Sequence, residues 1–167
     1  KESHIVNDMY YLYEKGENIA AFLYAIRQNE PVVYKRIVRV IQSIAPYFSD
    51  FYFNVSAADT VRLQWTDKFC STIYGPTDLS DGTIRFIALT TLFLQPVPPK
   101  VIIIDEPELG LHPLAIQKLA GMIKSAAAKG TQVIVATQSA DLISNFDAED
   151  IITINQTEGA SVMNRLS

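Results

Sequence analysis

The sequence "VIIIDEPELGLHP", residues 101–113, determines the predicted fold of this chain. It begins with four consecutive β-branched residues, which is typical of a strand buried on both faces of a parallel sheet. Asp105 and Glu106 follow where that strand ends. Ligands of open α/β sheets bind outside the carboxyl ends of the strands, so this pair of carboxylates is placed for chemistry rather than for packing.

The composition of the 167 residues, 49% hydrophobic and 19% charged, fits one globular domain. Cys70 is the only cysteine, which excludes an internal disulfide, and we expect it to lie in the core. With only His4 and His112 beside it, a zinc site with four ligands is not expected. The chain has neither a membrane-spanning apolar run nor a signal-peptide pattern, so we expect no membrane association and a cytoplasmic location.

The charge balance argues against a large non-specific nucleic-acid surface on this chain, because the net charge is -4 and the isoelectric point is about 5.1. The one basic cluster is Lys35, Arg36 and Arg39. These residues alternate with apolar ones at helical spacing. We therefore predict that they form the solvated face of an amphipathic helix.

Hydrophobic periodicity predicts a helical segment over residues 1–50, interrupted at Pro31 and ending near Pro46. Residues 51–78 contain short aromatic and β-branched stretches separated by polar turns, which predicts an antiparallel meander. Residues 79–167 then alternate between the two periods. The predicted elements are helices over 80–95, 113–128 and 140–145, and strands over 100–105, 132–137 and 150–155. This alternation predicts an α/β fold with a parallel sheet flanked by helices.

Two further motifs accompany the carboxylate pair. In "LSDGTIR", residues 79–85, Ser80 is a favourable helix N-cap, and Gly82 leaves the backbone N–H groups of the helix start open to an anion. In "VIVATQS", residues 133–139, a second buried strand ends in polar residues. Parallel strands end at the same edge of a sheet, so Gln138 is expected on the same edge as the first strand's carboxylates.

These three elements, in this order, resemble the signature, Walker B and switch sequences of ABC-like AAA ATPases, the group that includes SMC, RecF and OLD-type heads. The wording "LSDGTIRFIALTTLFL" and "IDEPELGLHP" is particularly close to predicted bacterial AAA-family ATPases related to RecF and OLD proteins. The resemblance covers nearly the whole chain. It implies the C-terminal lobe of a P-loop NTPase head, with ATP as substrate and Mg²⁺ as cofactor.

The resemblance also implies roles for three residues at the strand ends. Asp105 would hold the magnesium ion through water, and Glu106 would orient or deprotonate the attacking water. Gln138 stands where such heads usually carry a histidine that touches the γ-phosphate. A glutamine amide can hydrogen-bond a phosphate or a water, but it cannot carry positive charge.

Other residues would act across a dimer of heads. By the resemblance, Ser80 and Gly82 would complete the nucleotide site of an opposing head, and residues 108–112 would form the D-loop at a homodimer interface. Asp81 replaces the commoner glycine and is expected to point away from the phosphate. Arg85 is open to a structural or a phosphate-facing role. A DNA or effector partner is a further possibility that the sequence leaves open.

The chain contains no Walker A sequence, because none of its seven glycines begins G-x-x-x-x-G-K-[ST]. It also opens on Lys1. We therefore expect a fragment whose missing N-terminal lobe carries the phosphate loop, and which is inactive alone. The alternative is a non-catalytic interaction or scaffold module derived from such an ATPase. The presence of both Asp105 and Glu106 favours hydrolysis over this alternative.

The motif residues also have purely structural interpretations. Asp105 and Glu106 could be an exposed strand end, and Ser80 an ordinary helix cap. Gln138 could belong to a plain strand-to-helix connection.

Overall fold

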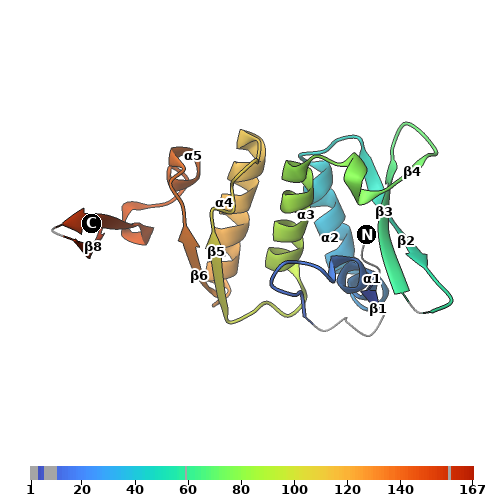
Figure 1. Ribbon diagram of the computed structural model, residues 1–167, viewed down its shortest axis with the longest axis horizontal. Helices are drawn as coiled ribbons and strands as arrows, with labels where there is room; N and C mark the ends of the chain where they lie inside the picture. The colour runs from blue at the N-terminus through green and yellow to red at the C-terminus, as the bar shows by residue number, and fades with distance from the viewer. Residues whose placement is uncertain (1–3, 6–10, 59, 158) are drawn as a thin grey trace.

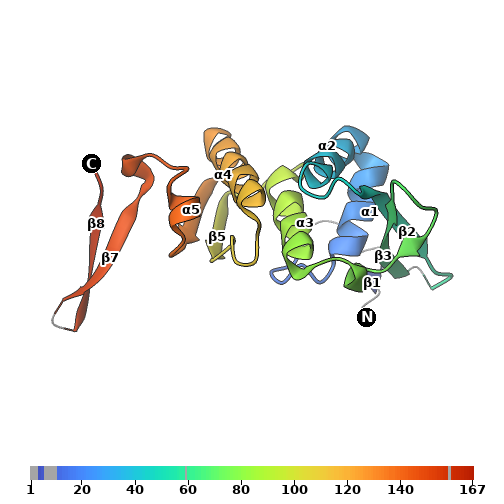
Figure 2. The ribbon, with the colours of Figure 1, turned by 90° about the horizontal axis from the view of Figure 1, so that it is seen from above.

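The structure is a computed structural model that describes residues 4–5, 11–58, 60–157 and 159–167. The predicted helical segment over 1–50 is only partly correct: residues 1–3 and 6–10 lie outside the described residues, residues 4–5 form a strand, and the first helix begins only at Ile19. The layers follow one another along the long axis of the molecule. An antiparallel sheet stands at one end, helices fill the middle, and a parallel strand pair and a hairpin form the other end (Figure 1, Figure 2).

Three helices lie in the middle of the molecule and contribute much of its core, together with the helix over residues 113–128. They are α1 (Ile19–Asn29), α2 (Pro31–Gln42) and α3 (Asp81–Leu94). Pro31 lies in the first turn of α2, where its fixed φ is favourable and its missing N–H costs nothing, so it separates α1 from α2. The basic residues of α2 are exposed, as predicted, and Tyr34 and Ile37 on its other face are buried.

The antiparallel sheet covers α1 and α2. Its strands are β1 (His4–Ile5), β2 (Phe48–Val55), β3 (Thr60–Asp67) and β4 (Ile73–Tyr74), followed by a short 3-10 helix, η1 (Pro76–Asp78). The predicted meander is confirmed, since β2, β3 and β4 pair in sequence order. Trp65 fixes the centre of the sheet: its ring stacks on Tyr74 at 4.7 Å between centroids, and its Nε1 donates to the carbonyl of Gly75 at 3.0 Å.

The prediction that Cys70 lies in the core is wrong. Cys70 is exposed, because it lies in the turn between β3 and β4, where the chain has left the sheet and Phe69 is also exposed. Its Sγ lies 3.3 Å from the Tyr74 hydroxyl oxygen. This hydrogen bond lowers the pKa of the Cys70 thiol.

The parallel part of the fold is a two-stranded sheet. Strand β5 (Val101–Asp105), helix α4 (Pro113–Ala128) and strand β6 (Gln132–Ala136) form a βαβ unit, which the short helix α5 (Ala140–Ile143) follows. The expectation that β5 is buried on both faces is wrong: Ile102 is 5% exposed and Ile103 is 74% exposed. The reason is that one face of β5 joins the core with α4, while the face bearing Ile103 does not.

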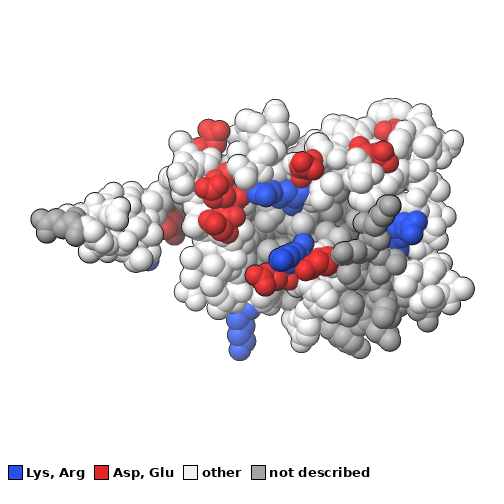
Figure 3. All heavy atoms as spheres, in the orientation of Figure 1, with Lys and Arg blue, Asp and Glu red and all other residues white. Residues whose placement is uncertain are grey.

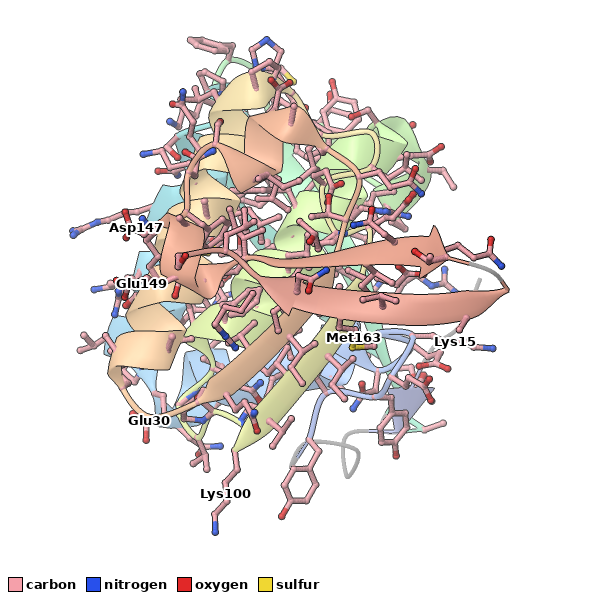
Figure 4. All side chains as sticks on the ribbon, turned by 90° about the vertical axis from the view of Figure 1, so that its left-hand side faces the viewer. Lys15, Glu30, Lys100, Asp147, Glu149 and Met163 are labelled. Carbon is pink, nitrogen blue, oxygen red and sulfur yellow. The ribbon has the colours of Figure 1, made fainter. Side chains whose placement is uncertain are left out.

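The predicted strand over 150–155 does not join this parallel sheet. After a 3-10 helix, η2 (Ala148–Asp150), strand β7 (Ile152–Thr157) pairs antiparallel with β8 (Ala160–Arg165). The hairpin extends away from the rest of the molecule (Figure 1, Figure 2). Figure 4 views the hairpin broadside, with its two strands running across the picture, Met163 on the hairpin and Glu149 at its base. Within the described residues, no helix is both long and apolar enough to cross a membrane.

Two adjacent buried threonines of α3 allow its packing to be tested. Thr90 and Thr91 are both fully buried, but only the Thr91 hydroxyl is bonded, to the carbonyl of Ile87 at 2.8 Å. The Thr90 hydroxyl has no partner within the described part of the chain. We expect Thr90→Val to raise the free energy of unfolding by about 1 kcal/mol, because a methyl group of the same shape replaces a buried unpaired hydroxyl.

Thr91→Val is the matched control, and it should leave the free energy of unfolding unchanged or lower it, because it removes a hydrogen bond that is made. Urea unfolding measures both variants. Equal destabilisation by the two substitutions would contradict the assignment of the Thr90 hydroxyl as unpaired.

Candidate functional site

The site is built at the carboxyl ends of β5 and β6. Asp105 is the last residue of β5, lies opposite Ala136 and is exposed. The N–H of Glu106 donates to the carbonyl of Ala136 at 2.8 Å, so the ladder continues one residue beyond the strand. Glu106 has a φ of 42°, a left-handed conformation that non-glycine residues rarely adopt and that is concentrated at functional sites.

The loop after β6 brings an amide to this carboxylate. Gln138 Nε2 donates to Glu106 Oε1 at 3.4 Å. The structure thus brings together Glu106 and Gln138, which the sequence placed on the same edge of the sheet from the ends of two separate strands. Ser139 then caps α5 by accepting from the N–H of Leu142 at 3.3 Å.

The start of α3 lies against the loop after β5. Ser80 is the N-cap of α3, as predicted, and its Oγ accepts from the N–H of Thr83 at 3.2 Å. Arg85, one turn further, donates from Nη1 to the carbonyl of Glu106 at 3.0 Å. Arg85 therefore has a structural contact in the described chain, which links α3 to the turn after β5.

Gly82 is required by packing within this chain. A Cβ at residue 82 would lie 2.3 Å from the carbonyl oxygen of Gly110, which is closer than real Cβ contacts, and 3.3 Å from the carbonyl carbon. The first turn of α3 thus rests directly on the loop between β5 and α4. This contact is a steric reason for glycine at residue 82, and the sequence alone did not reveal it.

Two residues of the site were missed in the sequence. Glu108 was expected at a dimer interface with residues 109–112, but its side chain is only 9% exposed and is buried in its own chain. Its Oε1 accepts a hydrogen bond from the Thr137 hydroxyl, and the N–H of Ser139 donates to Thr137 Oγ1 at 3.0 Å. Its Oε2 is buried and has no hydrogen-bond partner among the described residues. The only sequence signal was a glutamate and a threonine at two strand ends expected on one edge.

The rest of this loop, residues 109–112, was also expected at the dimer interface, and several of these residues are exposed. Leu109 is exposed, and Gly110 turns the chain with a φ of 77°. His112 caps α4, with Nδ1 accepting from the N–H of Leu114 at 3.3 Å, and Pro113 opens that helix as predicted. These residues, unlike Glu108, are accessible to a partner.

Few side chains that could bind a metal ion lie at the carboxyl ends of β5 and β6 in the described part of the chain. Acidic side chains gather near the carboxyl ends of β5 and β6, with a basic side chain beside them on the side of α3 (Figure 3). In the described part of the chain, no three carboxylate, imidazole or thiol side chains come together as a metal cage. Mg²⁺ usually keeps several waters and binds one or two carboxylates plus the phosphates of its substrate. The exposed carboxylate of Asp105 fits an ion held in that way.

Comparison with protein families gives a match over most of the chain. The family model described as "AAA domain, putative AbiEii toxin, Type IV TA system" matches residues 21–144. The energy-coupling factor transporter ATP-binding protein EcfA2 of Lactobacillus delbrueckii subsp. bulgaricus is 28% identical over 109 residues, which is 63% of this chain and 37% of that protein. EcfA2 of Streptococcus agalactiae is 30% identical over 71 residues, 42% of this chain and 25% of the relative. The chain thus matches 25–37% of the length of these relatives.

Solved structures with a similar fold are heads of SMC proteins. A structure described as "Structural biochemistry of ATP-driven dimerization and DNA stimulated activation of SMC ATPases" is similar with a TM-score of 0.62 and 17% identity, over 87% of this chain and 89% of that one. The Smc head domain from Pyrococcus furiosus, bound to the C-terminal domain of ScpA, gives a TM-score of 0.61 and 18% identity, over 92% of this chain and 42% of that one. At these identities the similarity establishes the fold alone.

Proposed function

The chain belongs to the AAA domain family that matches residues 21–144, and from this membership we propose that it is the C-terminal lobe of a head that binds and hydrolyses ATP. The sequence relatives are ATP-binding proteins of transporters, and the structural neighbours are SMC proteins, one of them described as an SMC ATPase. The remainder of the nucleotide site, with the phosphate loop, would come from another part of the intact protein.

One observation carries the proposal: the Gln138 amide lies 3.4 Å from the Glu106 carboxylate at the carboxyl edge of β5 and β6. The pair places a proton acceptor and a hydrogen-bond donor side by side at the ends of the two strands. Arg85 fixes the backbone of Glu106 from the side of α3. The backbone that carries this carboxylate is therefore held by α3, the helix that also carries Ser80 and Gly82.

In the proposed reaction, Glu106 accepts a proton from the attacking water or orients it, and Gln138 donates a hydrogen bond to that water or to a phosphate oxygen. Asp105 would hold Mg²⁺, which neutralises charge on the phosphates when it is bound. Phosphoryl transfer depends mainly on such positioning and charge stabilisation. Mg²⁺ at a site of this kind needs few protein ligands, and the single exposed carboxylate of Asp105 fits this requirement.

We further propose that two such heads form a homodimer around ATP. Ser80 and Gly82 at the start of α3 would face the nucleotide of the opposing head, with Leu109 and His112 at the contact between the loops. The support is the exposure of Ser80 and of these loop residues. Closure of the dimer would act on an attached effector or on DNA bound elsewhere in the intact protein.

The role of Asp105 provides the test of the proposed function. In the intact protein, Asp105→Asn should weaken binding of Mg-ATP by about tenfold or more, since even indirect changes at metal sites cost about 10–100-fold in metal affinity. Isothermal titration calorimetry with and without Mg²⁺ measures the effect. Binding of ATP in the presence of EDTA should be the same for wild type and variant.

Asp150→Asn is the control, because it makes the same change of charge at an exposed residue at the base of the hairpin. It should leave Mg-ATP binding unchanged. If the intact wild-type protein binds no Mg-ATP, the alternative of a non-catalytic scaffold module takes the place of the ATPase proposal.

A further inference from the structure

Glu108 is buried in a way that does not favour stability. One of its oxygens accepts from Thr137, but the other is buried without a hydrogen-bond partner in the described chain. Burial of a carboxylate with an unpaired oxygen costs free energy, and an apolar side chain of similar volume would often serve the fold as well or better. The reason for a glutamate at this position therefore lies outside the stability of the fold.

The hydrogen bonds of Glu108 lead directly to the candidate site. The N–H of Ser139 donates to Thr137 Oγ1, and the hydroxyl of Thr137 donates to Glu108 Oε1. Both bonds flank Gln138, whose side chain reaches Glu106. The Glu108 carboxylate thus ties the loop after β6 to the loop after β5, over a separation of 29 residues in the chain.

We propose that Glu108 is a positioning residue for ATP hydrolysis, which acts through Thr137 to hold Gln138 in register with Glu106. The inference rests on the proposed function. Without the acceptor at residue 108, the Thr137 hydroxyl is free to rotate, and the backbone on either side of Gln138 loses its tie to the loop of Glu106. Errors of about 1 Å in such positions can cost about 100-fold in rate.

The experiment uses Glu108→Met in the intact protein, because methionine has a similar length and adapts to irregular buried spaces. We expect kcat for ATP to fall by about 10- to 100-fold, with KM within about threefold. The melting temperature should stay the same or rise, since the buried unpaired oxygen is removed. A residue that only stabilised the fold would instead lower the melting temperature when replaced.

Two further variants show whether Glu108 acts as an acceptor and through Gln138. Glu108→Gln keeps an acceptor oxygen and should restore kcat to within about threefold of wild type. In a Gln138→Ala background, Glu108→Met should cause no additional loss, because residues that act as a unit are not additive. Amide exchange at Ser139 should be about tenfold faster in Glu108→Met and unchanged in Glu108→Gln.

Each outcome decides the inference. Wild-type kcat in Glu108→Met, a full additional loss in the Gln138→Ala background, or inactivity of Glu108→Gln would overturn it while leaving the ATPase proposal intact. Absence of turnover in the wild-type protein would instead overturn the proposed function, and the positioning role with it. The amide exchange of Ser139 separates these cases, because it reports on the tie between the loops without ATP.

Discussion

Replacement of Glu106 by glutamine in the intact protein is expected to lower ATP turnover by about 10²- to 10⁴-fold, the usual contribution of a positioned general base. ATP affinity should remain within about threefold of wild type, because Glu106 is proposed to contact only the attacking water. Glutamine keeps the shape of the side chain and removes its basicity. The backbone is held independently of the side chain, by the N–H bond to Ala136 and the Arg85 bond to the carbonyl.

The same substitution should accumulate an ATP-bound dimer, since binding persists while hydrolysis is slow. Single-turnover kinetics and gel filtration with ATP measure the two effects. Glu149→Gln is the control, as an exposed glutamate at the base of the hairpin. Hydrolysis at the wild-type rate by Glu106→Gln would show that Glu106 is not the base and that the carboxylate pair at the end of β5 has another purpose.

Helix boundaries were the part of the fold that the sequence predicted best. Pro31 and Pro113 open α2 and α4, and Ser80 caps α3, each through a local steric or hydrogen-bond preference. The predicted limits of the helix over 113–128 agree with α4. Such signals act within one turn of the chain, so they can be recognised without knowledge of the tertiary structure.

Strand pairing and burial were predicted less well, because both depend on distant parts of the chain. The β-branched residues of β7 indicate a strand but not its partner, which is β8 rather than β6. The run from Val101 to Ile104 indicates an apolar strand, but whether Ile103 is covered depends on what packs on the second face. Hydrophobicity alone cannot distinguish these cases.

The candidate site likewise has residues whose placement could be predicted from the sequence and residues whose contacts could not. Asp105, Glu106 and Gln138 could be found because they stand at the ends of strands, and parallel strands end at one edge of a sheet. The bond between Glu108 and Thr137 could not be predicted, because it needs two loops to approach within hydrogen-bonding distance. The steric role of Gly82 was hidden for the same reason.

Substitution of Gly82 by alanine is expected to lower the free energy of unfolding by about 1–3 kcal/mol, the usual cost of overpacking. The new Cβ would meet the carbonyl oxygen of Gly110 at 2.3 Å, and because this oxygen belongs to the backbone, no side-chain rotation relieves the contact. Intrinsic helix propensity predicts the opposite sign, since alanine in a helix is favoured over glycine by about 1 kcal/mol. The sign of the effect therefore separates packing from propensity.

Gly121→Ala is the matched control for this prediction. Gly121 lies within α4, and a Cβ there would meet nothing within 4 Å, so the same substitution should stabilise the protein by about 0.5–1 kcal/mol. Urea unfolding of the intact protein compares the two variants. If Gly82→Ala is as stable as Gly121→Ala, the contact with Gly110 does not require glycine. If it is stable but no longer dimerises with ATP, the requirement for glycine comes from the nucleotide of the opposing head, because only the space outside this chain would then be sensitive to the added methyl group.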